Sequence, residues 1–191
     1  MRHDLELAGF GVRLRPLDPS DAKAFAGEID ADFWRGMTTP LPRSIEDVER
    51  EFDRAVADPG RQPFAVVETA SGAVVGTTSL YDVVAHRLEV GHTFYLRSVW
   101  GTQVNPACKY LLFAHAFEEL RVWRVGLRCD SRNERSRAAI EKLGCRFEGI
   151  LRKHRAASDG VASDTAYFSI LDDEWPAARE RLAARLAAEG N

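Results

Sequence analysis

The sequence has few cysteines and no long apolar run, and each shortage excludes a class of protein. Its three cysteines, Cys108, Cys129 and Cys145, are an odd number without CxxC spacing. Reduced thiols are therefore expected rather than a disulfide framework. The first residues, MRHDLELAGFGVRLRP, are too polar for a signal peptide or a membrane span. We therefore expect a cytoplasmic protein with no membrane partner.

Several ligand-binding motifs are also missing. The chain contains neither GxxxxGK nor GxGxxG, and its five histidines include no HExxH pair. These absences disfavour a nucleotide-binding protein of another fold and predict no metal site. The formal net charge is −3 and the pI is about 6.0. Binding of nucleic acid through bulk positive charge is therefore not expected.

The length and the hydrophobic patterning predict one domain over residues 1–191. A chain of this size buries roughly 70% of its unfolded surface and needs no disulfides to fold. The alternation of strand-like and helix-like segments predicts a mixed α/β sheet with helices on its faces. Strands are expected at 12–17, 63–69, 73–83, 88–96, 122–129, 145–155 and 165–171, and helices at 18–29, 44–57, 105–120, 133–144 and about 173–189.

The stretch VWGTQVNPACKYLL (99–112) joins a predicted strand to a predicted helix. Asn105 is expected to be the N-cap and Pro106 the first helical residue, where a missing N–H costs nothing. The first N–H groups of a helix have no internal partner and often bind phosphate. Because Gly101 is the only glycine in this stretch, two interpretations stay open, a phosphate-binding loop or an ordinary capped turn.

Three other helix features can be read locally. S-I-E-D at Ser44 is close to a capping box, Asn133 is a natural N-cap, and Gly144 is expected to end the helix over 133–144. One apolar stripe at i, i+3, i+4 and i+7 is predicted to face the sheet. It consists of Phe113, Ala116, Phe117 and Leu120.

The later half of the chain carries two motifs. The first is N-x-x-S (Asn133, Ser136), and the second is L-G-x-x-x-E-G-x-L-R (Leu143, Gly144, Glu148, Gly149, Leu151, Arg152). With the strand, loop and helix before them, they resemble the GNAT superfamily of acyl-CoA-dependent N-acyltransferases. A late Asp-x-x-Tyr (Asp164, Tyr167) resembles its RimJ/RimL-like branch. The resemblance runs from about Val12 to Trp175. It implies a mostly antiparallel sheet of about seven strands flanked by helices, with a C-terminal helix.

The resemblance also implies a site for acetyl-CoA as co-substrate. The pyrophosphate is expected on the loop Gly101, Thr102, Gln103, Val104 and Asn105, with Lys109 adding a charge-assisted bond to a phosphate. The family pattern R/Q-x-x-G-x-G/A is not kept here, because Trp100, Gln103 and Asn105 occupy its defined positions. Pantetheine is expected to pair with Phe94, Tyr95 and Leu96 like an extra strand. A backbone N–H near Phe94 would stabilise the oxyanion.

Acyl transfer to an amine needs a base and an acid. The amine must be neutral, and a lysine-like amine has a pKa near 10.4. Glu89 matches a strand position at which some GNAT enzymes carry a catalytic glutamate. His92, with an ordinary pKa near 6.5, and a chain of water molecules are the alternatives. Asn133 and Ser136 are expected to contact the CoA arm, with Ser136 donating a proton to sulfur.

The acceptor is less well defined by the sequence. Phe33 and Trp34 are candidate acceptor-binding residues, in the segment where GNAT proteins build the acceptor wall. Four carboxylates could attract a cationic amine: Asp30, Asp32, Asp82 and Glu89. A small amine, such as an amino acid or an amine-bearing antibiotic, and a protein N-terminus are both kept as acceptors, reached by direct attack in a ternary complex. The alternative function is an acyl-CoA-binding sensor or assembly module with little turnover. A homodimer is left open.

Overall fold

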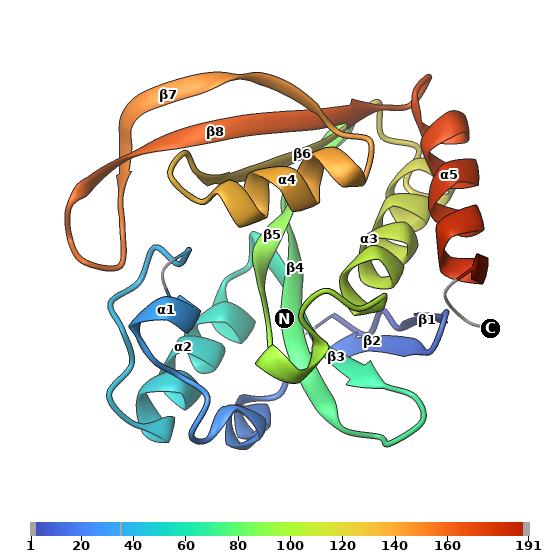
Figure 1. Cartoon of the computed structure of the whole chain (residues 1–191). Coiled ribbons are helices and arrows are strands. Elements are labelled where there is room, and N and C mark those ends of the chain that lie inside the picture. The colour runs from blue at the N-terminus through green and yellow to red at the C-terminus, as the bar shows by residue number, and fades with distance from the viewer. Residues whose placement is uncertain (1–2, 35, 189–191) are drawn as a thin grey trace.

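The computed structural model describes residues 3–34 and 36–188 (Figure 1). Its elements are β1 (Leu7–Gly9), β2 (Val12–Pro16), η1 (Pro19–Phe25), α1 (Ala31–Trp34), α2 (Ile45–Ala57), β3 (Arg61–Glu68), β4 (Val74–Val84), β5 (Arg87–Tyr95), η2 (Arg97–Val99), α3 (Val104–Ala114), η3 (His115–Glu119), β6 (Arg124–Asp130), α4 (Glu134–Lys142), β7 (Arg146–Ala156), β8 (Ala162–Leu171) and α5 (Trp175–Ala188).

The strands form one eight-stranded sheet in the order β1-β2-β3-β4-β5-β6-β8-β7. Only β5 and β6 are parallel among the described pairs, and the others are antiparallel. The predicted mixed, mostly antiparallel sheet is therefore confirmed. Strand β1 was not expected, because its three residues are too few for a periodicity to be read.

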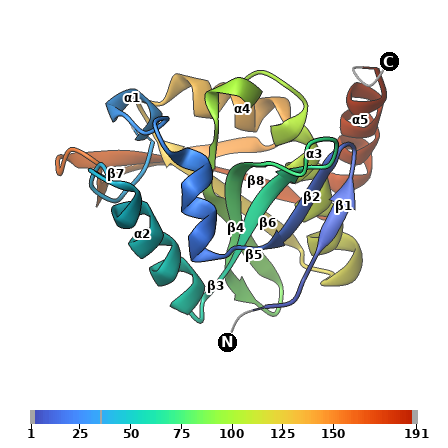
Figure 2. The same cartoon turned by 90° about the horizontal axis from the view of Figure 1, so that it is seen from below.

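Helices cover both faces of the sheet (Figures 1 and 2). Helices α3 and α5 pack on one face, where the larger core includes Phe64, Leu112 and Phe168. Elements η1, α1 and α2 pack on the other face around Phe25 and Phe52. Burial of these aromatic and aliphatic side chains is the main stabilising contribution.

Several local expectations are confirmed and some are corrected. The capping box at Ser44 forms with Asp47, and Gly144 has a left-handed φ of 95° just after α4. The predicted helix over 18–29 is a shorter 3₁₀ helix, η1. Leu120 was expected in the apolar stripe, but it is 41% exposed. The helix widens into a π turn at η3, which rotates later residues away from the sheet.

The divergence of β5 and β6 positions the site. The two strands pair only from Arg87 to Glu89, opposite 124–126. Beyond Glu89, β5 continues along β4 and β6 continues along β8. The second half of β5 therefore has a free edge on this side, and α3 and α4 begin beside it (Figure 1).

Candidate functional site

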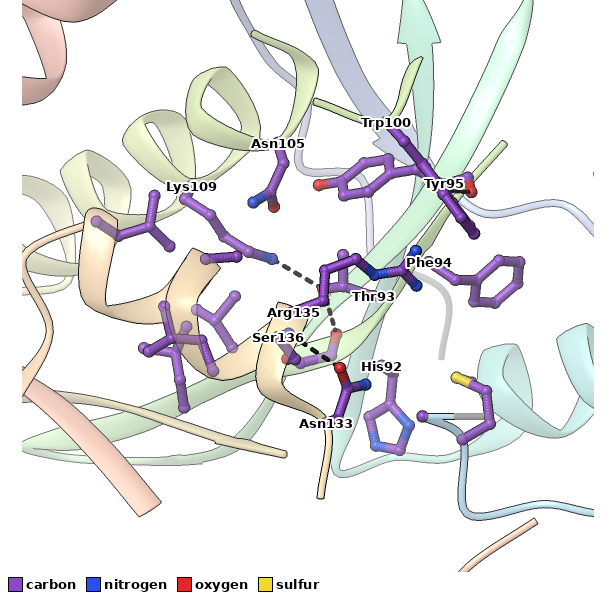
Figure 3. Close-up of a pocket in the computed structure, with 18 of the residues that line it drawn as sticks. His92, Thr93, Phe94, Tyr95, Trp100, Asn105, Lys109, Asn133, Arg135 and Ser136 are labelled. Carbon is purple, nitrogen blue, oxygen red and sulfur yellow. Dashed lines mark hydrogen bonds between the residues drawn. The ribbon is translucent and has the colours of Figure 1, made fainter. Parts of the chain in front are cut away.

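A cavity of about 270 Å³ lies between the second half of β5, the start of α3 and the start of α4. Figure 3 shows side chains from all three elements pointing into it. Nine residues predicted for the site line this cavity: Phe33, His92, Phe94, Tyr95, Gly101, Asn105, Lys109, Asn133 and Ser136. Six others do not: Trp34, Glu89, Leu96, Thr102, Gln103 and Val104.

Strand β5 contains a β-bulge at the edge of this cavity. Phe94 pairs with Thr77, whereas Gly91 pairs with Ser79, so two residues of β5 stand opposite Thr78. His92, inside the bulge, has a φ of 48°. A bulge interrupts the ladder and leaves an extra residue unpaired. The predicted oxyanion donor near Phe94 thus lies beside an irregularity of the kind that re-aims backbone groups.

His92 has the environment of a neutral imidazole. Its ring packs edge-on against Tyr81, with ring centroids 5.0 Å apart. Burial, together with the positive charges of Arg61, Arg128 and Arg155, lowers the pKa of His92 to about 4. At neutral pH the side chain is therefore uncharged and keeps a nitrogen lone pair that can accept a proton.

Glu89 has a different environment from the one expected of a free base. Its carboxylate accepts a hydrogen bond from Tyr81 Oη at 2.7 Å and pairs with Arg128 Nε at 3.2 Å. It does not line the cavity. The geometry thus favours His92 over Glu89.

Two of the other carboxylates proposed to attract a cationic amine, Asp30 and Asp82, each lie close to an arginine. Asp30 accepts from Arg97 at 2.6 Å, and the Phe33 N–H and Arg97 together lower the pKa of its carboxyl. Asp82 lies 4.0 Å from Arg128. These two carboxylates therefore give little net negative charge to the cavity, so the predicted attraction of a cationic amine is not supported for them.

The start of α3 differs from the prediction. The helix begins at Val104, so Asn105 is its second residue and not its N-cap. Thr102 accepts the Val104 N–H at 3.3 Å through its hydroxyl. Pro106 still fits, since the first four N–H groups of a helix have no partner within it. With no capping role, the Asn105 side chain is free to line the cavity (Figure 3).

The loop before α3 is held by aromatic contacts. Trp100 donates from Nε1 to the Tyr95 carbonyl at 2.7 Å and stacks on Phe33 at 6.2 Å. The guanidinium of Arg135 lies 3.8 Å from the Trp100 ring. Trp100 therefore has a structural role at the position where the family pattern has arginine or glutamine. Arg135 was missed, because a charged residue in a first helical turn has no distinctive pattern.

The start of α4 is built as predicted. Asn133 is the N-cap, and its Oδ1 accepts the Ser136 N–H at 2.9 Å. Both side chains line the cavity. A Cβ on Gly36 would lie 2.9 Å from Asn133 Nδ2, so glycine lets the segment after α1 close against α4.

Lys109 extends toward β5 and not toward the loop at 101–105, a direction that does not favour the predicted phosphate contact. The side chain is 4% exposed, and its Nζ donates to Thr93 Oγ1 at 2.8 Å and to Thr78 Oγ1 at 3.1 Å. Helix α3 turns this side chain inward, toward the bulge of β5. Sequence spacing put Lys109 one turn after the loop but could not give its direction.

The two candidate acceptor residues have separate environments. Phe33 lines the cavity with Met37 beside it. Trp34 is 1% exposed, donates from Nε1 to the Thr39 carbonyl at 2.9 Å, and packs against Phe94. Trp34 is therefore a core residue, while Phe33 stays a candidate for acceptor binding.

No group of three or more His, Cys, Asp or Glu within 3–34 and 36–188 is arranged to hold a metal ion. Over the same residues, no helix is long and apolar enough to cross a bilayer.

Known proteins resemble both the sequence and the fold. Residues 12–146 match the acetyltransferase (GNAT) domain family. The chain is 33% identical over 106 residues to a Bacillus subtilis protein named "Putative ribosomal N-acetyltransferase YdaF", a match covering 54% of this chain and 57% of YdaF. A GCN5-related N-acetyltransferase from Brucella melitensis is 29% identical, with a TM-score of 0.90 over 98% of this chain and 87% of that one.

A more distant structure shares the fold. Mycobacterium smegmatis RimJ, solved in complex with CoA-disulfide, is 22% identical, with a TM-score of 0.79 over 99% of this chain and 98% of RimJ. The family match spans most of the chain and includes the bulge of β5, α3 and α4. The protein is therefore a member of the GNAT acetyltransferase family and an N-acetyltransferase by class.

Proposed function

We propose that this protein transfers an acetyl group from acetyl-CoA to a primary amine, by direct attack within a ternary complex. The observation that carries the proposal is the cavity at the bulge of β5. There a neutral His92 lies across the strand end from two helix N-termini, those of α3 and α4.

The donor is assigned to the side of the cavity formed by α3 and α4. Helix N-termini carry partial positive charge and unpaired N–H groups, which suit a pyrophosphate. Gly101 has a φ of 78°, and nothing lies within 4 Å of where its Cβ would be, which leaves space for phosphate oxygens. The end of β5 around Phe94 and Tyr95 has no neighbouring strand on the β6 side, so an extended pantetheine arm would lie along this edge.

The acceptor is assigned to the side formed by Phe33, Met37 and His92. His92 would accept the proton that the amine loses on attack, either directly or through water. Ser136, at the start of α4, stays a proposed contact to the CoA arm. Of the two acceptors left open by the sequence, we favour a protein N-terminus, because YdaF is named a ribosomal N-acetyltransferase.

A thiol-release assay with acetyl-CoA tests this proposal. The panel holds peptides with free N-termini, the same peptides with blocked N-termini, free amino acids and amine-bearing antibiotics. Thiol release with free but not blocked peptides is expected. Release only with small amines would contradict the choice of acceptor. CoA binding by calorimetry without release across the panel would favour the alternative, a CoA-binding module.

A further inference from the structure

Lys109 is a buried cation with unusually few partners. Its side chain is 4% exposed at the side of the cavity. Within residues 3–34 and 36–188, no carboxylate lies within ion-pair distance of its Nζ. A buried ammonium is costly unless it is paired. Because its neighbours are two neutral hydroxyls, the structure as it stands leaves most of that cost uncompensated.

The hydrogen bonds around Lys109 leave one N–H without a partner. Nζ donates to Thr78 Oγ1 and to Thr93 Oγ1. The two hydroxyls are 2.8 Å apart, and Thr93 can donate to the Gly91 carbonyl at 3.3 Å. Every hydroxyl proton in this chain of bonds can therefore be assigned. An ammonium has three N–H groups, so a third remains for a ligand.

The place of Lys109 Nζ beside the bulge of β5 indicates which ligand atom the third N–H would meet. Lys109 lies one turn after Asn105 at the start of α3, and its Nζ reaches Thr93 in the bulge of β5 (Figure 3). A donor anchored at the start of α3 and running along β5 would bring its reacting end to this bulge. Two atoms of that donor gain negative charge during transfer: the acyl oxygen in the tetrahedral adduct and the sulfur when the adduct collapses. The acyl oxygen already has a proposed partner, the backbone N–H near Phe94, which leaves the sulfur for Lys109.

We propose that Lys109 is the catalytic residue that stabilises the thiolate leaving group of the acyl donor. The inference rests on the proposed function, since it assumes a thioester donor. When the tetrahedral adduct collapses, the carbon–sulfur bond breaks and its electron pair stays on sulfur. The ammonium hydrogen-bonds to the thiolate and then transfers one proton to it, giving CoA thiol and a neutral lysine. Solvent reprotonates Lys109 after the product leaves, while the proton of the amine goes to His92 or water.

Proton affinities around Lys109 support this assignment. Burial lowers the pKa of Lys109 to about 8, close to the value of about 8.5 for an ordinary thiol. Its titratable neighbours are Cys108 on α3 and Cys145 before β7, whose pKa values burial raises to about 11 and about 12. Both stay neutral thiols at neutral pH. His92 on β5 is also uncharged there.

A titration of bound CoA tests the proposal without any turnover. CoA with a free thiol is bound to the protein, and its thiolate absorbance is followed against pH. A cation within about 4–6 Å is expected to lower the thiol pKa by about 1 to 3 relative to free CoA. Lys109→Met, or Lys109→Gln as a second neutral variant, should restore the free value. An unshifted thiol pKa in the unmodified protein, or an equal shift in the neutral variants, overturns the proposal.

Steady-state kinetics and a control variant, Thr78→Val, distinguish a catalytic role of Lys109 from a role that only supports the bulge of β5. Lys109→Met is expected to lower kcat by about 10²–10³, with a smaller change in KM for acetyl-CoA. Thr78→Val removes one partner of Nζ but keeps the cation, so it should keep the lowered thiol pKa. If Thr78→Val abolishes that shift as Lys109→Met does, the lysine only supports the bulge. A shifted thiol pKa with no thiol release to any amine would refute the proposed function and leave the cation site standing.

Discussion

Replacing Lys109 by methionine should make the protein more stable. The pKa of the buried ammonium falls from 10.5 to about 8 because of desolvation. At about 1.36 kcal/mol per pKa unit, this corresponds to about 3 kcal/mol of destabilisation while the group is charged. Methionine has a similar length and no charge, so it removes this penalty.

Lost hydrogen bonds offset part of the gain. Thr78 and Thr93 each lose a donor, at about 1 kcal/mol per bond, but they keep the bond between them. The expected net gain for Lys109→Met at pH 7 is about 1–2 kcal/mol. For a domain of this size that is a rise in Tm of roughly 2–8 °C.

The pH dependence gives a sharper test than the size of the gain. Below pH 8 both the folded and the unfolded protein carry the charge, and the folded state bears the full penalty. Between about pH 8 and 10.5 the unfolded state binds more protons, so the free energy of unfolding of the unmodified protein rises with pH. The advantage of Lys109→Met should therefore shrink over this range.

Thermal and chemical denaturation at pH 7 and at pH 10 would measure both effects. Lys142→Met, at an exposed position in α4, is the matched control and should change stability little at either pH. If Lys109→Met is less stable at pH 7 and the difference does not change with pH, the argument for an unpaired buried cation is wrong.

Three further predictions concern the cavity. His92→Ala should lower kcat by about 10²–10⁴ with little change in acetyl-CoA binding, whereas Glu89→Gln, whose carboxylate is bound to Tyr81 and Arg128, should keep kcat within tenfold; steady-state kinetics showing the reverse order would restore Glu89 as the base. Asn133→Ala removes the N-cap of α4 and should cost about 0.5–2 kcal/mol in urea unfolding, and a change below that range would mean that the cap contributes little. Gly101→Val forces a β-branched residue to a φ of 78°, so calorimetry should show weaker CoA binding; an unchanged affinity would argue against this loop as the phosphate site.

Local patterns in the sequence were enough to predict the elements. Apolar runs, one of them alternating, and the turn residues between them specified seven of the eight strands in the described part of the chain. Local hydrogen-bonding residues specified the caps at Ser44 and Asn133. These features depend on neighbours a few positions away, so the sequence carries them directly. The prediction that Asn105 is the N-cap of α3 was wrong, because the helix begins at Val104, whose N–H binds the Thr102 hydroxyl. Where the helix begins depends on how the preceding loop packs, and Trp100 fixes that loop through its bond to the Tyr95 carbonyl.

The resemblance of motifs gave the family, but not the environment of each site residue. The glutamate of the E-G-x-L-R motif, Glu148, is paired with Arg124 at 2.5 Å and bonded to Ser169 at 2.6 Å, which is a role in joining strands. Glu89 likewise has partners on β4 and β6. Such partners are many residues distant along the chain, and no local pattern records them.

The sequence by itself determined the order of strands and helices, the helix caps formed by neighbouring residues, and the family. The tertiary structure decided which side chains share the cavity, that His92 is neutral while Glu89 is ion-paired, and that Lys109 points at the bulge of β5 rather than at the loop. The physical reason is the distance along the chain over which each kind of interaction acts. Periodicity and capping act within a few residues, whereas desolvation and charge pairing depend on elements that meet only after the sheet has formed.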